Sequence, residues 1–383
     1  MKTEQEDVLD ALRDTAARFA SDKLSPLYQQ RERGEHRIER SLLKEMGSLG
    51  LIAPELPEKF GGLGVSQVAT GVITEAISYG DFNVGYAQVF GSLLGHIISR
   101  HALPELGSHW TRQITRGEAI VAIALTEPSG GSDAASISTK AVRKNDRYLI
   151  SGEKTSISGA EQVDAFVVVA RTGRVEDGPR GISAFLVPAS SKGISRTKFD
   201  DFGSKIVGRG SVFFDEVEVP AENLLGQEGQ AFTHVMSGLD FSRVLIALQC
   251  IGAARASIDE TWKYIVQRKA FGKAISEFQG VSFPLVEAEG LLLSTRQLCY
   301  HALTLAHQRR MYTVESALAK MMGPKQAFDA IHACLLLHGH YGYSMDLPHQ
   351  QRMRDVMGLE LGDGTEQIMK KIVTRERVQR TGS

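Results

Sequence analysis

Cysteine is scarce in this chain of 383 residues, which contains only three. Cys250, Cys299 and Cys334 lie far apart, so they fit neither a disulfide framework nor a zinc site with short Cys-x-x-Cys arms. We therefore expect reduced thiols and a cytoplasmic setting. The amino terminus is acidic and lacks an apolar core, which is not the pattern of a secretory or transit peptide.

An excess of charge of one sign is also lacking. The 44 lysines and arginines nearly balance the 45 aspartates and glutamates, which gives a formal net charge of −1. Because no dense basic run occurs either, the chain has no general attraction to nucleic acid or anionic lipid. No apolar run approaches the length that spans a membrane. We therefore expect neither nucleic acid nor a membrane among the partners.

Familiar catalytic and metal-binding motifs are missing as well. The chain has neither the Gly-x-Ser-x-Gly elbow of many hydrolases nor the Gly-x-x-x-x-Gly-Lys-Ser/Thr loop of nucleotide hydrolases. His338 and His340 are two residues apart, so they do not share a helix face, and no nearby cysteine completes a metal-binding set. We therefore predict no metal site.

The pattern of apolar residues divides the chain into three parts. Helical spacing fits residues 4–24, 39–48, 66–79, 84–101 and 104–116. From about 119 to 220 the period becomes strand-like, with turn residues between the apolar runs. Long helical patterns then cover 230–268, 277–310 and 314–338, and a shorter pair flanks the last glycines. We predict an α+β multidomain protein with an N-terminal α-helical domain (1–118), a middle antiparallel β domain (119–225) and a C-terminal helical bundle (226–383).

One polar turn follows the first predicted strand and begins at Thr126. Pro128 ends the strand pattern, and Gly130 and Gly131 allow a ligand to approach the backbone closely. The hydroxyls of Thr126 and Ser132 add polar groups to the same turn. Such a turn suits a flat polar ligand or a phosphate, although a plain turn after a strand has the same composition.

Asp363 is the candidate catalytic carboxylate. Glycines on both sides leave its backbone unshielded, and a catalytic base needs such access. The alternative is that Asp363 caps the helix that begins near Thr365, because Asp in a Gly-rich turn is a normal helix cap.

Two groups of charged residues have both a structural and a ligand-binding interpretation. Asp240 and Arg243 are three residues apart on one helix face, which is typical of a solvated face, but Arg also suits a phosphate or an adenine ring. Arg268, Lys269 and Lys273 surround Phe271 at a predicted helix end, where cations favour the helix dipole or bind a diphosphate.

The order of these motifs resembles the acyl-CoA dehydrogenase family over nearly the whole chain. The matching segments are Thr126-Glu-Pro-x-Gly-Gly-Ser132-Asp133, Gly152-Glu-Lys154-x-x-Ile157-Ser158, Asp240-x-x-Arg243, Arg268-x-x-Phe271-Gly272-Lys273, Gly339-x-x-Gly342-Tyr343, Arg354-Asp355 and Gly364-Thr365-x-Gln367-Ile368. The resemblance implies an enzyme that holds FAD noncovalently, oxidises an acyl-CoA thioester and usually forms a homotetramer. It also implies electron-transferring flavoprotein as the oxidant, although an oxidase that uses O₂ remains open.

The resemblance implies a role for each matching position. Flavin-ring contacts would come from Leu125, Thr126 and Ser158. The rest of FAD would contact Arg268, Phe271, Gln279, Gly339, Thr365 and Gln367, with its diphosphate and adenosine bound across a subunit contact. The CoA substrate would contact Ser132, Asp240, Arg243 and Gly364. Asp363 stands where the family has its glutamate base, and burial should raise its pKa. In the family, a flavin hydroxyl and the amide of the base residue polarise the thioester carbonyl while hydride passes to the flavin.

Three positions depart from the family pattern. Asp363 replaces Glu, which shortens the reach by roughly 1.5 Å, and Ser242 supplies no carboxylate where some branches place theirs. Gly362 stands where an aromatic residue often precedes the base, and Ser156 where a tryptophan is common. Both changes open space, so we predict a wide pocket for a cyclic or branched acyl group such as cyclohexanecarboxyl-CoA. Its far end would be closed by Tyr86, Gln88 and Phe90.

Three other functions fit parts of the pattern. A nitroalkane-oxidase-like enzyme is favoured by the aspartate at the base position and opposed by Ser132, Asp240 and Arg243. Dehydrogenation of an acyl group on a carrier protein would need a surface for that carrier. A DNA-associated role, which the family also includes, is opposed by the balanced charge.

Overall fold

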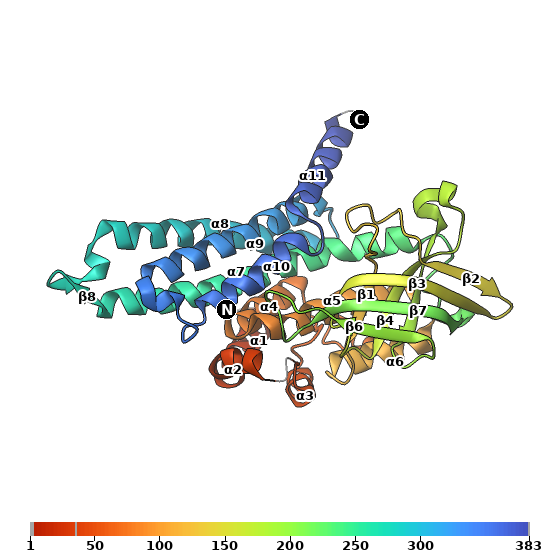
Figure 1. The fold of residues 1–383 in the computed structure, drawn as a ribbon, viewed down its shortest axis with the longest axis horizontal. Coiled ribbons are helices and arrows are strands. Elements are labelled where there is room, and N and C mark those ends of the chain that lie inside the picture. The colour runs from red at the N-terminus through yellow and green to blue at the C-terminus, as the bar shows by residue number, and fades with distance from the viewer. Residues whose placement is uncertain (1–3, 35–36, 382–383) are drawn as a thin grey trace.

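The computed structural model describes residues 4–34 and 37–381 and has an elongated shape. A helical bundle forms one end, a β sheet forms the other, and the N-terminal helices pack along the region between them (Figure 1). The predicted fold class, with helical, β and helical parts in that order, is confirmed.

Six α-helices make up the N-terminal part: α1 (Glu4–Phe19), α2 (Tyr28–Arg33), α3 (Arg40–Ser48), α4 (Gln67–Gly80), α5 (Phe82–His101) and α6 (Pro104–Thr115). A π-helical turn, Ala20–Leu24, continues α1 over the predicted range. Side chains set the starts of two helices: Ser66 accepts a hydrogen bond from the Ala69 amide, and Asp81 accepts one from the Asn83 amide. The short helix α2 was not predicted.

Seven strands form the sheet: β1 (Val121–Ala124), β2 (Lys140–Lys144), β3 (Arg147–Ser158), β4 (Ala165–Arg171), β5 (Ile182–Pro188), β6 (Ile194–Lys198) and β7 (Arg209–Pro220). The predicted antiparallel arrangement holds for β2–β3, β3–β7, β4–β5 and β6–β7. However, β1 pairs with β4 in parallel, and β2 also meets β4 in parallel at one residue pair. The sheet is therefore mixed.

Both faces of strand β4 are buried. Val167 and Val169 pack in the core shared with the N-terminal helices, whereas Phe166 and Val168 pack in the core on the other side of the sheet. This alternation follows from the two-residue period of a strand. The strands β2 and β6 were not predicted, because most of their side chains are polar and exposed.

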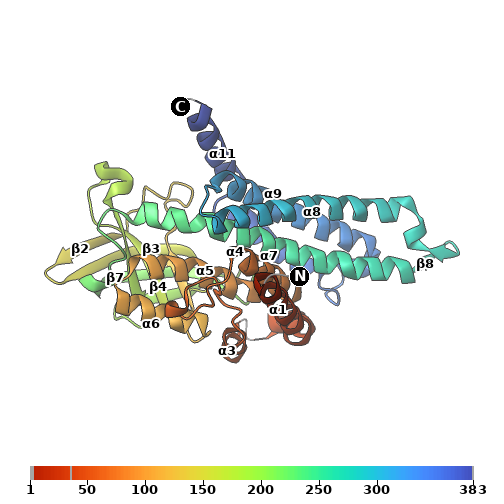
Figure 2. The ribbon, with the colours of Figure 1, turned by 180° about the vertical axis from the view of Figure 1, so that it is seen from behind.

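The C-terminal part contains five helices: α7 (Ala231–Gln267), α8 (Gln279–His307), α9 (Thr313–Leu337), α10 (His349–Leu361) and α11 (Glu366–Thr381). Two short strands, β8 (Lys269–Ala270) and β9 (Lys273–Ala274), form a hairpin at the end of α7. In both views α11 projects away from the body (Figure 2). Among the described residues, only α7 is long and apolar enough to cross a membrane, but 94% of its apolar window is buried inside the protein.

Helices α4 and α7 approach closely because α7 carries a glycine at their contact. A Cβ atom at Gly252 would lie 2.5 Å from the backbone oxygen of Glu75 in α4. Gly290 in α8 is a matched contrast, because a Cβ atom there would meet nothing within 4 Å.

We expect Gly252→Ala to lower the free energy of unfolding by about 1–3 kcal/mol, because backbone atoms cannot yield as a side chain can. Gly290→Ala should instead raise it by about 0.5–1 kcal/mol, since alanine loses less conformational entropy in a helix. Chemical denaturation of both variants tests this. A Gly252→Ala variant as stable as the parent would show that the two helices are free to separate.

Candidate active site

The turn that contains Asp363 lies between α10 and α11. Asp363 and Gly364 both have positive φ angles, 55° and 99°, so the chain reverses sharply here. The Thr365 hydroxyl accepts a hydrogen bond of 3.4 Å from the Ile368 amide. Thr365, and not Asp363, therefore caps α11, which leaves the Asp363 carboxylate free for another role.

The Asp363 carboxyl lies in a partly buried, electrically positive setting. Burial raises its pKa, and the charges of Lys320 and Arg243 offset part of that rise. No side chain among the described residues donates a hydrogen bond to this carboxylate. A carboxyl group with a raised pKa and no bound donor is suited to accept a proton.

Two buried cations hold the backbone of this turn. Lys320 on α9 donates hydrogen bonds to the carbonyl oxygens of Leu359 and Gly364, at 2.7 and 3.0 Å. The Arg243 guanidinium donates one of 3.5 Å to the Asp363 carbonyl oxygen. The turn is therefore fixed on both sides of Asp363.

Sequence reasoning missed Lys320, although a signal was present. The residues Ser316, Gly323 and Ala327 are buried on the same face of α9 as Lys320. A lysine among small residues on the inner face of a predicted helix requires a polar partner, and that requirement identifies it as a candidate.

Asp240 and Arg243 form an ion pair of 3.1 Å, and it is buried. The Thr313 hydroxyl donates a hydrogen bond of 2.6 Å to Asp240, which joins α7 to α9. The solvated face that helical spacing allowed is therefore not observed. The structure places Arg243 beside the Asp363 turn, and this placement favours support of that turn over a contact with an adenine ring.

The residues predicted to close the acyl pocket do not share one surface. Tyr86 and Phe90 are one helical turn apart on α5, and their rings pack edge to face with centroids 5.3 Å apart. The Asp363 carboxylate is near enough to Tyr86 to raise the pKa of its hydroxyl, which burial raises most. Gln88 lies on the other side of α5, where its side-chain oxygen accepts a hydrogen bond from the Ala53 amide. The structure therefore brings Tyr86 and Phe90 together, but not Gln88.

The Thr126 turn is built on a buried ion pair. The Lys154 ammonium lies 2.8 Å from the Glu127 carboxylate, and both side chains are almost fully buried. Lys154 also donates to the Leu125 carbonyl oxygen at 2.9 Å, and Ser138 donates to Glu127 through its amide and its hydroxyl. Burial alone would raise the pKa of Glu127, but the hydrogen bonds from Lys154 and Ser138 lower it to about 2. Burial lowers the pKa of Lys154 to about 8.

This pair leaves the outer groups of the turn available to a ligand. The hydroxyls of Thr126 and Ser158 are partly exposed and make no hydrogen bond to a described residue. Ser158 lies at the end of β3, opposite Arg209. Ser132, Gly130 and Gly131 are exposed, so the turn offers its backbone and hydroxyls together, as a polar ring edge requires.

The remaining predicted cofactor residues form two further groups. Arg268, Phe271 and Gln279 lie at or beside the β8–β9 hairpin, at the tip of the molecule farthest from the sheet (Figures 1 and 2). Phe271 is 94% exposed. Gly339 follows α9 at the same end, since the neighbouring His338 stacks on Tyr264 of α7 at 4.2 Å. Thr365 and Gln367 lie at the start of α11, and Gln367 is exposed. Within one chain, the hairpin residues therefore lie far from the Thr126 turn.

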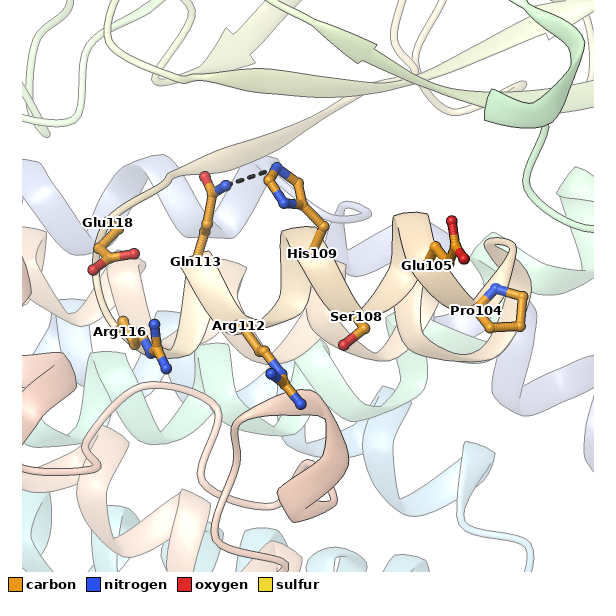
Figure 3. A pocket seen from close by; sticks show the side chains of 8 residues that line it. All are labelled: Pro104, Glu105, Ser108, His109, Arg112, Gln113, Arg116 and Glu118. Atoms are coloured by element: carbon orange, nitrogen blue, oxygen red, sulfur yellow. Dashed lines mark hydrogen bonds between the residues drawn. The ribbon is translucent and has the colours of Figure 1, made fainter.

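A hollow of about 640 Å³ lies elsewhere, along the outer face of α6 (Figure 3). His109 and Gln113, one helical turn apart on α6, make a hydrogen bond of 2.8 Å along its surface. Its lining comes from this helix and the residues just after it, and includes Pro104, Glu105, Ser108, His109, Arg112, Gln113, Arg116 and Glu118. Because none of the catalytic candidates reaches this hollow, we do not assign it to the active site.

Comparison with known proteins matches the whole arrangement. The N-terminal, middle and C-terminal domains of acyl-CoA dehydrogenases match residues 6–118, 122–217 and 229–377. The chain belongs to the acyl-CoA dehydrogenase family. It is therefore an oxidoreductase and a flavoprotein that uses FAD. No group of three or more metal-ligating side chains occurs among the described residues.

Individual relatives cover nearly the full chain. The mitochondrial short-chain specific acyl-CoA dehydrogenase of Rattus norvegicus is 34% identical over 94% of this chain and 88% of its own length. The structure of butyryl-CoA dehydrogenase from Megasphaera elsdenii is 28% identical, with a TM-score of 0.92 and 99% coverage of both chains. A structure described as an electron transferring flavoprotein of Acidaminococcus fermentans is 31% identical, with a TM-score of 0.94 and 98% coverage of both chains.

We expect Lys154→Met to lower the free energy of unfolding by about 3–5 kcal/mol near pH 7.5, because it leaves the buried Glu127 carboxylate without a cation. The thermal midpoint should fall and FAD should dissociate more readily. Lys140→Met, which removes an exposed lysine from the same sheet, serves as the control and should change neither quantity.

Lys154→Met should also reverse the way in which this pair's contribution to stability changes as the pH falls. In the parent, the pKa of Glu127 is about 2, below its usual 4.5, so the stability from this pair is present above pH 4.5 and lost as the pH falls through 2. Without Lys154, burial raises the pKa of Glu127, so the variant gains stability as the pH falls. Thermal midpoints between pH 7.5 and 5 should therefore converge, and a constant difference would contradict this account.

Proposed function

We propose that this acyl-CoA dehydrogenase uses Asp363 as the base that removes the α-proton of its thioester substrate. The observation that carries the proposal is a partly buried carboxylate with a raised pKa, free of side-chain hydrogen-bond donors among the described residues and held in a turn between two cations. A short-chain acyl-CoA dehydrogenase among the relatives supports the same reaction.

The reaction requires two groups from the protein. An α-proton beside a thioester is only weakly acidic, so a carboxylate must remove it while a donor polarises the thioester carbonyl. The Asp363 carboxylate supplies the first group. The backbone amide of Asp363 supplies the donor, since this amide donates no hydrogen bond to a described residue. When bound, FAD accepts the hydride from the β-carbon.

We propose that two copies of the chain complete one cofactor site. Leu125, Thr126 and Ser158 bind the flavin ring in one copy. The diphosphate and adenosine contact Arg268, Phe271, Gln279 and Gly339 of another copy, and Thr365 and Gln367 complete the contacts. The exposed Phe271 at the molecular tip supports this division, because its ring is 94% exposed and a second copy that covers it would remove apolar surface from water. A homotetramer, which the family resemblance implies, provides such a partner.

We propose that the acyl group is cyclic or branched. The aspartate is shorter than a glutamate, so the α-carbon has to lie closer to the backbone of the turn. Gly362 adds room because it places no side chain beside the turn; a Cβ atom there would make only ordinary contacts, at 3.5 Å with the Gly358 carbonyl oxygen and 3.6 Å with Leu359. Tyr86 and Phe90 form the opposing aromatic surface. Ser132 and Gly364 are the remaining contacts of the CoA arm, and electron-transferring flavoprotein is the oxidant, in keeping with the relative of that description.

Asp363→Asn should slow reduction of the flavin by an acyl-CoA about 10²–10⁴-fold, because general base catalysis contributes a factor of that size. Asp363→Glu should retain more activity with straight-chain than with branched thioesters, since it restores the longer reach. Stopped-flow bleaching of the flavin measures both variants. Reduction of Asp363→Asn at the parent rate would exclude Asp363 as the base.

A panel of thioesters tests the acyl group. With butyryl-CoA, isobutyryl-CoA, cyclohexanecarboxyl-CoA and an artificial electron acceptor, we expect the highest kcat/KM for one of the last two. Turnover of butyryl-CoA alone would overturn the wide pocket. Reduction by a nitroalkane, with no response to any thioester, would favour the nitroalkane-oxidase-like alternative.

A further inference from the structure

Lys320 is a buried lysine without a carboxylate in salt-bridge contact. Its side chain is 2% exposed and lies inside the bundle. Both of its hydrogen bonds go to backbone carbonyl oxygens, those of Leu359 and Gly364. No ion pair to Lys320 occurs among the described residues.

The other fully buried lysine shows what is unusual about this arrangement. Lys154 has the Glu127 carboxylate at 2.8 Å, which compensates for the loss of water around its charge. Lys320 has only carbonyl dipoles in contact. Leu359 lies in the last turn of α10, where carbonyl oxygens have no partner within the helix, so the ammonium group also satisfies a helix end.

Several charged or titratable groups surround Lys320. They are Asp363 from the base turn, Glu360 from α10, and Arg243 and Cys250 from α7. Asp363 has the strongest favourable interaction with Lys320 among them, and in return Lys320 has the strongest favourable interaction with Asp363. Tyr86 of α5 also lies near enough to Asp363 for that carboxylate to raise the pKa of the tyrosine hydroxyl.

We propose that Lys320 is a positioning residue for the proton-abstracting carboxylate: it fixes the turn on both sides of Asp363 and supplies the positive charge that keeps this carboxyl group ionised. This inference rests on the proposed role of Asp363. Lys320 touches the backbone of the turn, so it acts through Asp363.

The short aspartate makes this positioning more demanding. A misplacement of about 1 Å can cost on the order of 100-fold in rate. A glutamate has one more rotatable bond with which to adjust, whereas Asp363 depends on where its backbone lies. The two lysine hydrogen bonds and the one from Arg243 determine that position.

The experiment compares Lys320→Met, Lys320→Arg and the control Lys325→Met in the FAD-loaded enzyme. Lys325 is exposed on the same helix and pairs with Asp329. The rate of flavin reduction by the best acyl-CoA of the panel is measured from pH 5 to 9. We expect Lys320→Met to slow reduction at least ~10-fold at pH 7 and to move the acid limb upward by about one pH unit or more, because an ionised neighbour lowers a carboxyl pKa by that amount. Lys320→Arg should keep the acid limb in place, and Lys325→Met should match the parent.

A second measurement needs no substrate. The difference in thermal midpoint between the parent and Asp363→Asn, followed against pH, reports the titration of Asp363 by linkage. The same difference in the Lys320→Met background should titrate at a higher pH. If Asp363→Asn reduces its flavin at the parent rate, the proposed function fails. If Asp363→Asn is inactive but Lys320→Met leaves both titrations unchanged, only the role of Lys320 is overturned.

Discussion

Each of the two turns of the proposed site is bound on its inner side by one buried lysine. Lys154 binds the Leu125 carbonyl oxygen and the Glu127 carboxylate, and Lys320 binds the carbonyl oxygens of Leu359 and Gly364. If the amides and hydroxyls of a turn are to bind a ligand, they cannot also form the hydrogen bonds that hold the turn in place. A buried ammonium group solves this problem, since its three donors satisfy inward-facing oxygens and leave the outward groups unused. The free-energy cost of burying each lysine is therefore accepted because the lysine keeps the ligand-binding groups of its turn available.

The two turns lie in different parts of an elongated molecule, and this separation explains why each needs its own buried lysine. The Thr126 turn belongs to the sheet, the Asp363 turn belongs to the bundle, and α5 lies between them with Tyr86 and Phe90. A ligand that spans the two turns therefore contacts parts of the chain with separate cores. Small rotations of one core against the other would change the separation of the turns. The close approach of α4 and α7 at Gly252 opposes such a rotation within the helical part.

The fold was largely predictable from the sequence because its long helices are amphipathic or apolar throughout. The predictions failed where local pattern and tertiary setting differ. Strands β2 and β6 are mostly exposed and polar, so their pairing depends on neighbours that the pattern does not reveal. The parallel pairing of β1 with β4 is a property of topology and not of composition.

The site was predictable residue by residue only where the chain is locally constrained. Asp363 stood out because glycines flank it. Gln88 was placed with Tyr86 and Phe90, although residues two apart on a helix point in different directions. The contact of Arg243 with the CoA substrate stays a prediction, whereas its bonds to Asp240 and to the Asp363 carbonyl oxygen were not foreseen from the sequence. Lys320 was missed because its function depends on carbonyl oxygens 39 and 44 residues away, which no local pattern contains.

The pairing of Asp363 with Lys320 also constrains the proton in the proposed reaction. Before the proton transfer, the negative charge of Asp363 partly compensates the charge of the buried Lys320 ammonium group. After the transfer, Asp363 is neutral and Lys320 keeps its charge with only carbonyl dipoles around it, which is electrostatically unfavourable. This imbalance favours release of the proton from Asp363 once product has formed, because release restores the favourable charge interaction between Asp363 and Lys320. The same charge that weakens Asp363 as a base therefore prepares it for the next turnover, and the raised pKa from burial keeps it basic enough to react.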